Sequence, residues 1–211
     1  ISKHKCLMEG IEKIELKDIK ISGQLDLRIK LLGISELKDN HLFETVHPCL
    51  VSKKSYIGNV TGVMNAVILK GKPIGESILQ GEGAGPGPTT SSLISDLCSV
   101  LRGNIKFPFV ISNRKRKLAS FESINNKKFS VYLRLDVKDK HGILSDIAKV
   151  MAKHKVSIKR LIQNQTTNKK NASIVIITHE AKSFSLDKIK SILTKKKYIV
   201  SKPKLIRIEN I

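Results

Sequence analysis

The chain has 211 residues, of which 39 are Lys or Arg and 18 are Asp or Glu, so its formal net charge is +21. A hydrophobic content of 40% excludes a disordered polycation. No apolar stretch reaches the roughly 18 residues that a membrane-spanning helix needs, and no signal-peptide core opens the chain. We therefore expect a cytoplasmic protein with one large or two small domains and no membrane partner.

The first part of the chain, residues 1–105, has short apolar runs separated by turns. Its patterns predict strands over 28–37 and 41–50. They also predict a hairpin formed by 63–70 and 73–80. A helix follows, with apolar residues at helical spacing over 93–101 and four Ser or Thr residues before it.

A glycine-rich loop, Gly81 to Pro88, precedes that helix. Glycines allow close approach of a ligand to the backbone, and a helix N-terminus offers N–H groups to an anion or a polarised amide. The glycine spacing fits neither a P-loop nor a dinucleotide fingerprint. From spacing alone, a purely structural turn is the favoured interpretation.

Residues 106–127 are polar and basic, which is typical of a linker between domains. The second part, residues 128–211, alternates between strand-like and helix-like periods. Its expected elements are strand 129–137, helix 143–154, strands 156–163 and 172–179, helix 186–196 and strand 199–208. This βαββαβ order predicts a ferredoxin-like domain, with four antiparallel strands and both helices on one face. The open face of such a sheet commonly pairs with a second copy.

A second candidate site lies at the first strand-to-helix junction of this domain, in the segment Asp139 to Leu144. Gly142 permits a tight turn, and the N–H groups that begin the helix could receive a small carboxylate. A capped turn with no ligand is the alternative.

The charge alone suggests nucleic-acid binding, because clustered cations release counterions from phosphates. Aromatic residues make up only 4% of the chain and Trp is absent, so the sequence predicts no stacking platform. The basic runs 114–117 and 195–197 are more simply a solvated linker and a solvated helix end. We therefore do not favour a nucleic-acid partner.

The spacing of the cysteines and histidines predicts neither a metal site nor a disulfide. The three cysteines, Cys6, Cys49 and Cys98, lie far apart and form no CxxC pair. His47 and His179 have no metal-ligand spacing to another His or Cys. We expect no metal site in this chain.

Several motifs occur in an order that is specific as a set. In the first part they are Glu9-Gly10-Ile11, Ile29-Lys30-Leu31-Leu32-Gly33, Val46-His47-Pro48, Thr61-Gly62-Val63, and Gly83-Ala84-Gly85 with Pro88-Thr89. Together they resemble the later catalytic region of bacterial homoserine dehydrogenases. In the second part, Tyr132-Leu133-Arg134-Leu135, Asp139, Gly142-Ile143-Leu144, Gln163 and Thr178-His179 resemble the ACT domain, an amino-acid-binding regulatory module that closes many of these enzymes.

The resemblance implies an α/β (α+β) chain in which 1–105 is a mixed-sheet part of the catalytic domain and 128–211 is the ACT domain. It implies an NAD- or NADP-dependent interconversion of L-homoserine and L-aspartate 4-semialdehyde, in threonine, methionine and isoleucine biosynthesis. The choice between NAD and NADP is open. The family's Rossmann domain, metal loop, substrate carboxylates and catalytic lysine would precede Ile1. We therefore expect no catalytic residue here and no turnover by this chain alone, and Lys30 belongs to a structural strand motif.

The resemblance also implies two sets of binding residues. Gly85 matches the position where the family's backbone touches the cofactor near its nicotinamide end, and Gly83 and Ala84 shape the same turn.

The ACT resemblance places an effector site at Asp139, Gly142, Ile143 and Leu144, with His141 where Pro is usual. Threonine is the expected effector. Side-by-side pairing of ACT domains implies a homo-oligomer. The alternative to a dehydrogenase is a stand-alone amino-acid-sensing ACT protein.

Overall fold

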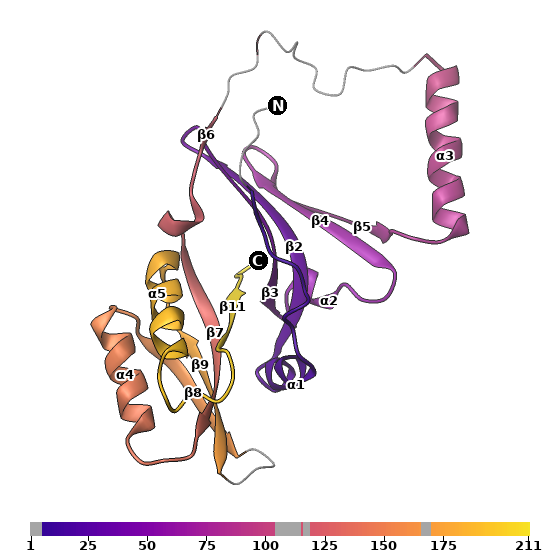
Figure 1. The fold of residues 1–211 in the computed structure, drawn as a ribbon. Coiled ribbons are helices and arrows are strands. Elements are labelled where there is room, and N and C mark those ends of the chain that lie inside the picture. Colours follow the sequence, from indigo (N-terminus) through magenta and orange to yellow (C-terminus); the bar gives the residue numbers. More distant parts are fainter. Residues whose placement is uncertain (1–5, 104–114, 116–118, 166–169) are drawn as a thin grey trace. The chain divides into compact units, whose positions relative to one another are not determined.

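The computed structural model of the protein describes residues 6–103, 115, 119–165 and 170–211 (Figure 1). The chain forms two compact units. The large unit comprises 1–53 together with 119–211, and the small unit comprises 54–118. This division differs from the expected one at 105 and 128, because the first strands of the chain share a sheet with its second half. Most of the expected linker, 106–127, lies outside the described residues.

The large unit is built on one nine-stranded sheet. Its strands are β1 (Leu7–Met8), β2 (Leu27–Lys38), β3 (His41–Ser52), β6 (Ser120–Phe121), β7 (Lys128–Lys138), β8 (Ile158–Gln165), β9 (Asn171–Thr178), β10 (Ala181–Lys182) and β11 (Lys204–Ile208). Its helices are α1 (Leu16–Gln24), the short 3₁₀ turn η2 (Ile124–Asn126), α4 (Ile143–Lys153) and α5 (Ser183–Thr194). The strand order along the main path is β1-β3-β11-β7-β9-β8. Off this path, β2 and β6 pair with β3, and β10 pairs with β7.

The predicted βαββαβ order is confirmed in the second half, as β7-α4-β8-β9-α5-β11. Strands β11, β7, β9 and β8 pair antiparallel in that order. Helix α4 buries Ile143, Ile147 and Met151, which are one turn apart along one face. Helix α5 buries its own apolar face in the same core.

Strand β11 joins the two halves of the chain. Strand β11 pairs with β7 on one side and, in parallel, with β3 on the other, where Arg207 lies opposite Cys49 and Ile208 opposite Leu50. The N–H of Glu209 donates to the carbonyl of Leu50 at 2.8 Å. The hairpin of β2 and β3 therefore extends the sheet of the second half.

Both faces of β7 are buried. Val131, Leu133 and Leu135 pack with the helices α4 and α5. Tyr132 alternates to the opposite face, as the period of a strand requires, and packs in a second cluster with Val175. Helix α1 contributes to this second cluster through Ile21. Part of the face that we expected to be open for a second copy is thus covered by the chain's own α1, which the sequence did not predict.

The small unit contains α2 (Tyr56–Asn59), the hairpin of β4 (Met64–Gly71) and β5 (Gly75–Glu82), and α3 (Pro86–Leu101). The predicted hairpin is confirmed, with an antiparallel register from Met64↔Glu82 to Gly71↔Gly75. Helix α3 begins at Pro86, seven residues before the expected range, because proline is well suited to a first helical position. No residue of α3 is buried. Its exposed apolar residues are Leu93, Ile94, Leu97, Val100 and Leu101.

The described helices include none that combines the length and the apolar character needed to cross a membrane.

Candidate functional site

The turn of Gly83, Ala84 and Gly85 connects β5 to α3 in the small unit. Gly85 is the N-cap of α3, with φ at 121° and ψ at 157°, a conformation open to glycine and costly for other residues. Its carbonyl accepts the N–H of Thr89 at 3.2 Å and so begins the helix. All three turn residues are exposed. The backbone of this turn is therefore accessible to a ligand.

The start of α3 is nevertheless a poor anion site. Pro86 and Pro88 occupy the first and third helical positions, and proline has no N–H to donate. Gly87 is left as the one residue with an N–H among those three positions. The start of α3 therefore offers few backbone donors to a phosphate. This corrects the expectation of several free N–H groups at the helix start.

The expected effector residues lie on one turn of the large unit, between β7 and α4. Gly142 is the N-cap of α4, with φ at 83°, which is left-handed and favours glycine. Ile143 is buried, whereas Leu144 and Asp139 are exposed. Asp139 lines a concavity together with Lys140, His141 and Gln163. The geometry therefore leaves room for a small ligand beside the turn, with His141 at its edge.

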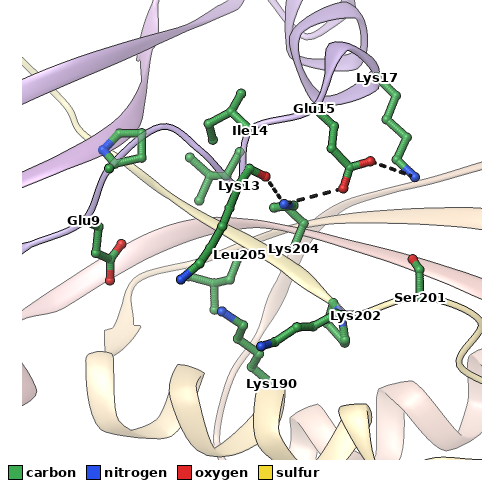
Figure 2. Close-up of a pocket in the computed structure, with 14 residues that line it drawn as sticks. Glu9, Lys13, Ile14, Glu15, Lys17, Lys190, Ser201, Lys202, Lys204 and Leu205 are labelled. Atoms are coloured by element: carbon green, nitrogen blue, oxygen red, sulfur yellow. Dashed lines mark hydrogen bonds and ion pairs between the residues drawn. The ribbon is translucent and has the colours of Figure 1, made fainter.

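A separate cavity of about 330 Å³ lies in the large unit (Figure 2). Three segments form most of it: residues 9–17, helix α5 and the stretch 201–206 that includes the start of β11. Its charged lining residues are Glu9, Lys13, Glu15, Lys17, Lys190, Lys202 and Lys204. No sequence pattern predicts this cavity, because its lysines come from segments that are far apart in the chain.

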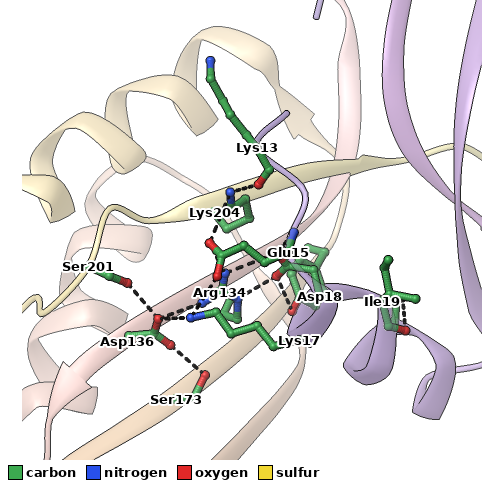
Figure 3. A network of polar contacts seen from close by, with 12 residues as sticks. Lys13, Glu15, Lys17, Asp18, Ile19, Arg134, Asp136, Ser173, Ser201 and Lys204 are labelled. Carbon is green, nitrogen blue, oxygen red and sulfur yellow. Dashed lines mark hydrogen bonds and ion pairs between the residues drawn. The ribbon is translucent and has the colours of Figure 1, made fainter. Parts of the chain in front are cut away.

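A buried ion pair lies at the centre of a polar network next to this cavity (Figure 3). The Nε of Arg134 on β7 donates to Oδ1 of Asp18 on α1 at 2.6 Å, and its Nη2 donates to Oδ2 at 3.2 Å. Both residues are buried, with 2% of Arg134 and 0% of Asp18 exposed. The hydroxyl of Tyr132 and the N–H of Glu15 also donate to Asp18, each at 3.2 Å. Each of the two oxygens of the buried Asp18 carboxylate therefore accepts two hydrogen bonds.

The outer part of the network surrounds Asp136, two residues further along β7. Its carboxylate accepts from Nη1 of Arg134 and from the ammonium of Lys17, each at 2.7 Å. It also accepts from the hydroxyls of Ser173 at 3.1 Å and Ser201 at 2.7 Å.

Glu15 completes the network by pairing with Nη2 of Arg134 at 3.1 Å and with Lys204 at 3.5 Å. These ion pairs connect three cations, Arg134, Lys17 and Lys204, with three carboxylates, Asp18, Asp136 and Glu15.

The network controls the ionisation of its central groups. Burial raises the pKa of Asp136, but hydrogen bonds from Lys17 and Ser201 and the charge of Arg134 outweigh it and lower that pKa to about 2. Burial lowers the pKa of Arg134, but its hydrogen bond with Asp18 and the charges of Asp18 and Asp136 more than offset this, so the pKa lies above its ordinary value. Both groups stay ionised at neutral pH.

Arg134 stands in the sequence within an ACT-like motif, and no sequence pattern pairs it with Asp18. A usable signal was present, because Arg134 interrupts an apolar strand whose neighbours are Leu133 and Leu135. An arginine in such a strand is almost never fully buried unless it is paired.

Replacement of Arg134 by Met should destabilise the large unit by about 3–5 kcal/mol, because it leaves the Asp18 carboxylate buried without its partner. The double variant Arg134→Met with Asp18→Asn should recover much of that loss, since no uncompensated charge is left. Urea unfolding of the two single variants and the double variant measures both effects. Strictly additive losses would contradict a direct coupling between the two residues.

Asp136 should make the stability depend on pH at the acid end. Because the pKa of its carboxyl is lowered from 3.8 to about 2 in the folded chain, its stabilisation is complete above about pH 4 and is lost as the pH falls towards 2. Between pH 5 and pH 2 the wild type should lose roughly 1–3 kcal/mol more than Asp136→Asn. Urea unfolding across that range tests this, with Asp139→Asn at the exposed turn as the control. Equal acid slopes for the wild type and Asp136→Asn would rule this account out.

Comparisons with known proteins agree with both sets of motifs. Residues 1–98 match the family model for homoserine dehydrogenase, and residues 131–197 match the model for the ACT domain. The homoserine dehydrogenase of Helicobacter pylori is 32% identical over 205 residues, which is 97% of this chain and 48% of that protein. The homoserine dehydrogenase of Neisseria gonorrhoeae is 35% identical over 180 residues, 82% of this chain and 41% of that protein.

Solved structures show the same fold. A homoserine dehydrogenase from Thiobacillus denitrificans superimposes with a TM-score of 0.82 at 29% identity, over 96% of this chain and 47% of that one. A homoserine dehydrogenase from S. aureus, at 23% identity and a TM-score of 0.59, supports the fold alone. The chain spans about half the length of these relatives. By sequence and fold the chain matches a part of the homoserine dehydrogenases that includes an ACT domain.

Proposed function

We propose that this chain is part of a homoserine dehydrogenase that interconverts L-homoserine and L-aspartate 4-semialdehyde, and that its ACT domain senses an amino acid. The observation that carries the proposal is the exposed glycine turn at 83–85, found between strand and helix in a chain that is similar to these enzymes over 97% of its length. Within this proposal the cofactor is NAD or NADP, and the effector is threonine.

The glycine turn would position the cofactor but would provide no reactive group. NAD or NADP, when bound, accepts or donates the hydride of this reaction. Gly83, Ala84 and Gly85 would hold its nicotinamide end through backbone contacts, since none of them offers a reactive side chain. Substrate binding and proton transfer would fall to other parts of the enzyme. This chain alone should therefore show no turnover.

The surface of α3 supports packing against further protein. Five large apolar residues are exposed on this helix, and Leu93 and Leu101 are 65% and 78% exposed. An apolar face of this kind marks an interaction surface in soluble proteins. In the proposed enzyme, this face of the small unit packs against the rest of the catalytic domain.

Side-chain contacts connect the ACT domain to the first half of the chain. The proposed effector turn, Asp139 to Leu144, directly follows β7, the strand that carries Arg134 and Asp136. Those two side chains bind α1 through Asp18 and Lys17. An effector that shifts the end of β7 would therefore act on α1, with a coupling free energy of about 1–3 kcal/mol.

The glycine turn can be tested in a fusion that joins the first half of the Helicobacter pylori enzyme to this chain. The fusion should oxidise homoserine, whereas the 211-residue chain alone should not. Gly85→Val should lower kcat/KM for the nucleotide roughly 10- to 100-fold, because valine cannot adopt this backbone conformation without strain. Gly87→Ala is the matched control in the same loop, since an added Cβ there meets nothing within 4 Å.

Two results would overturn the proposal. One is turnover by the chain alone. The other is equal activity of the Gly85→Val and Gly87→Ala fusions. A folded but inactive fusion, together with saturable threonine binding by the chain alone, would support the stand-alone sensor instead.

A further inference from the structure

Three ammonium groups, none of them in an ion pair within the described part of the chain, converge on the cavity of Figure 2. Lys13 comes from the segment before α1, Lys190 from α5 and Lys202 from the segment before β11. Figure 2 shows their side chains gathered on one side of the cavity. Among the described residues, none of the three has an ion-pair partner within 4.0 Å, although other lysines in the chain do.

The carboxylates near this cluster are already engaged. Glu15 pairs with Lys17 at 3.2 Å and with Arg134 at 3.1 Å. Glu9 accepts from Arg207 at 3.0 Å. Asp187, on α5, accepts from the hydroxyl of Ser183. The cavity therefore has an excess of positive charge that the described part of the chain does not balance.

This arrangement is unfavourable for the ammonium of Lys190, because the residue is half-buried. Burial lowers its pKa; the charges of Asp187 and Glu9 raise it, and those of Lys13 and Lys202 lower it further, so the pKa lies below its ordinary value. A bound anion would relieve both the repulsion and the loss of solvation.

We propose that this cavity binds the phosphate group of a small anionic molecule. A phosphate carries a charge of about −1.5 to −2 at pH 7 and three acceptor oxygens, which suits three converging ammonium groups. Lysine binds phosphate as a point charge. Planar carboxylates are better matched by the fork of arginine, and the described lining residues include no arginine.

The cavity has room for a phosphate with a small organic group, since its volume is about 330 Å³. Inorganic phosphate and a phosphate monoester share the chemistry, and the experiment separates them. All the residues involved belong to the large unit and lie outside the glycine turn and the effector turn. The inference therefore does not depend on the proposed function.

Titration calorimetry of the full chain at constant ionic strength tests this, with inorganic phosphate, ribose 5-phosphate and citrate as probes. One phosphate should bind per chain. Tighter binding of ribose 5-phosphate than of phosphate would identify a monoester as the ligand, and the reverse order would identify free phosphate. Lys190→Met, which keeps most of the aliphatic stem, should weaken the preferred probe at least 10-fold. Lys188→Met is the matched control, because its ammonium lies over the ring of Phe184 on the same helix and does not line the cavity.

Without phosphate, Lys190→Met should melt at the same temperature as the wild type or higher, because the substitution removes repulsion between like charges. Lys202→Met, on an exposed segment, gives a second measure should Lys190→Met fail to fold, and it should weaken binding in the same direction. The proposal fails if neither phosphate probe saturates, if Lys188→Met weakens binding as much as Lys190→Met, or if citrate binds as tightly as the preferred phosphate.

Discussion

The buried guanidinium of Arg134 is the constraint on which the large unit depends. Its side chain is 1% exposed, and a buried charge is tolerated only when it is paired and hydrogen-bonded. β7 itself supplies one partner, Asp136. The fully buried partner is Asp18, which lies 116 residues earlier in the chain. A carboxylate from the first half of the chain therefore neutralises the guanidinium that is buried in the second half.

This pairing explains why the structural units do not follow the order of the sequence. Helix α1 lies on the face of the sheet that carries Tyr132 and Arg134, and β3 extends the same sheet beyond β11. The first 53 residues are consequently packed with the ACT domain in one unit. The strands and ion pairs of this unit are therefore shared between residues that match homoserine dehydrogenase and residues that match the ACT domain.

Much of the local structure could be predicted from the sequence. The strand β7 and the helices α4 and α5 have clear apolar periods, and composition predicts the glycine-rich loop 81–88 that contains the turn at 83–85. Helix α1 was missed because its sequence, LKDIKISGQ, has few apolar residues and a glycine near its end. Its Asp18 accepts from the N–H of Glu15 at the start of the helix and binds Arg134, and no local pattern reveals the second contact.

The parts of the site that were not predicted share one cause, which is distance along the chain. The pairing of β3 with β11 and the meeting of Lys13, Lys190 and Lys202 each join segments more than 150 residues apart. Periodicity and spacing report on neighbours in sequence. Long-range pairs require either the structure or an unexpected residue, such as an arginine within an apolar strand, to indicate them.

Hydrogen exchange of the α1 amides in Arg134→Met tests the central claim most directly. If the buried pair holds α1 on the sheet, the amides of α1 should lose protection in this variant, while those of α4, whose core does not contain Arg134, stay protected. Unchanged protection of α1, in a variant that has lost the guanidinium, would contradict the claim that Arg134 and Asp18 join the two halves of the chain.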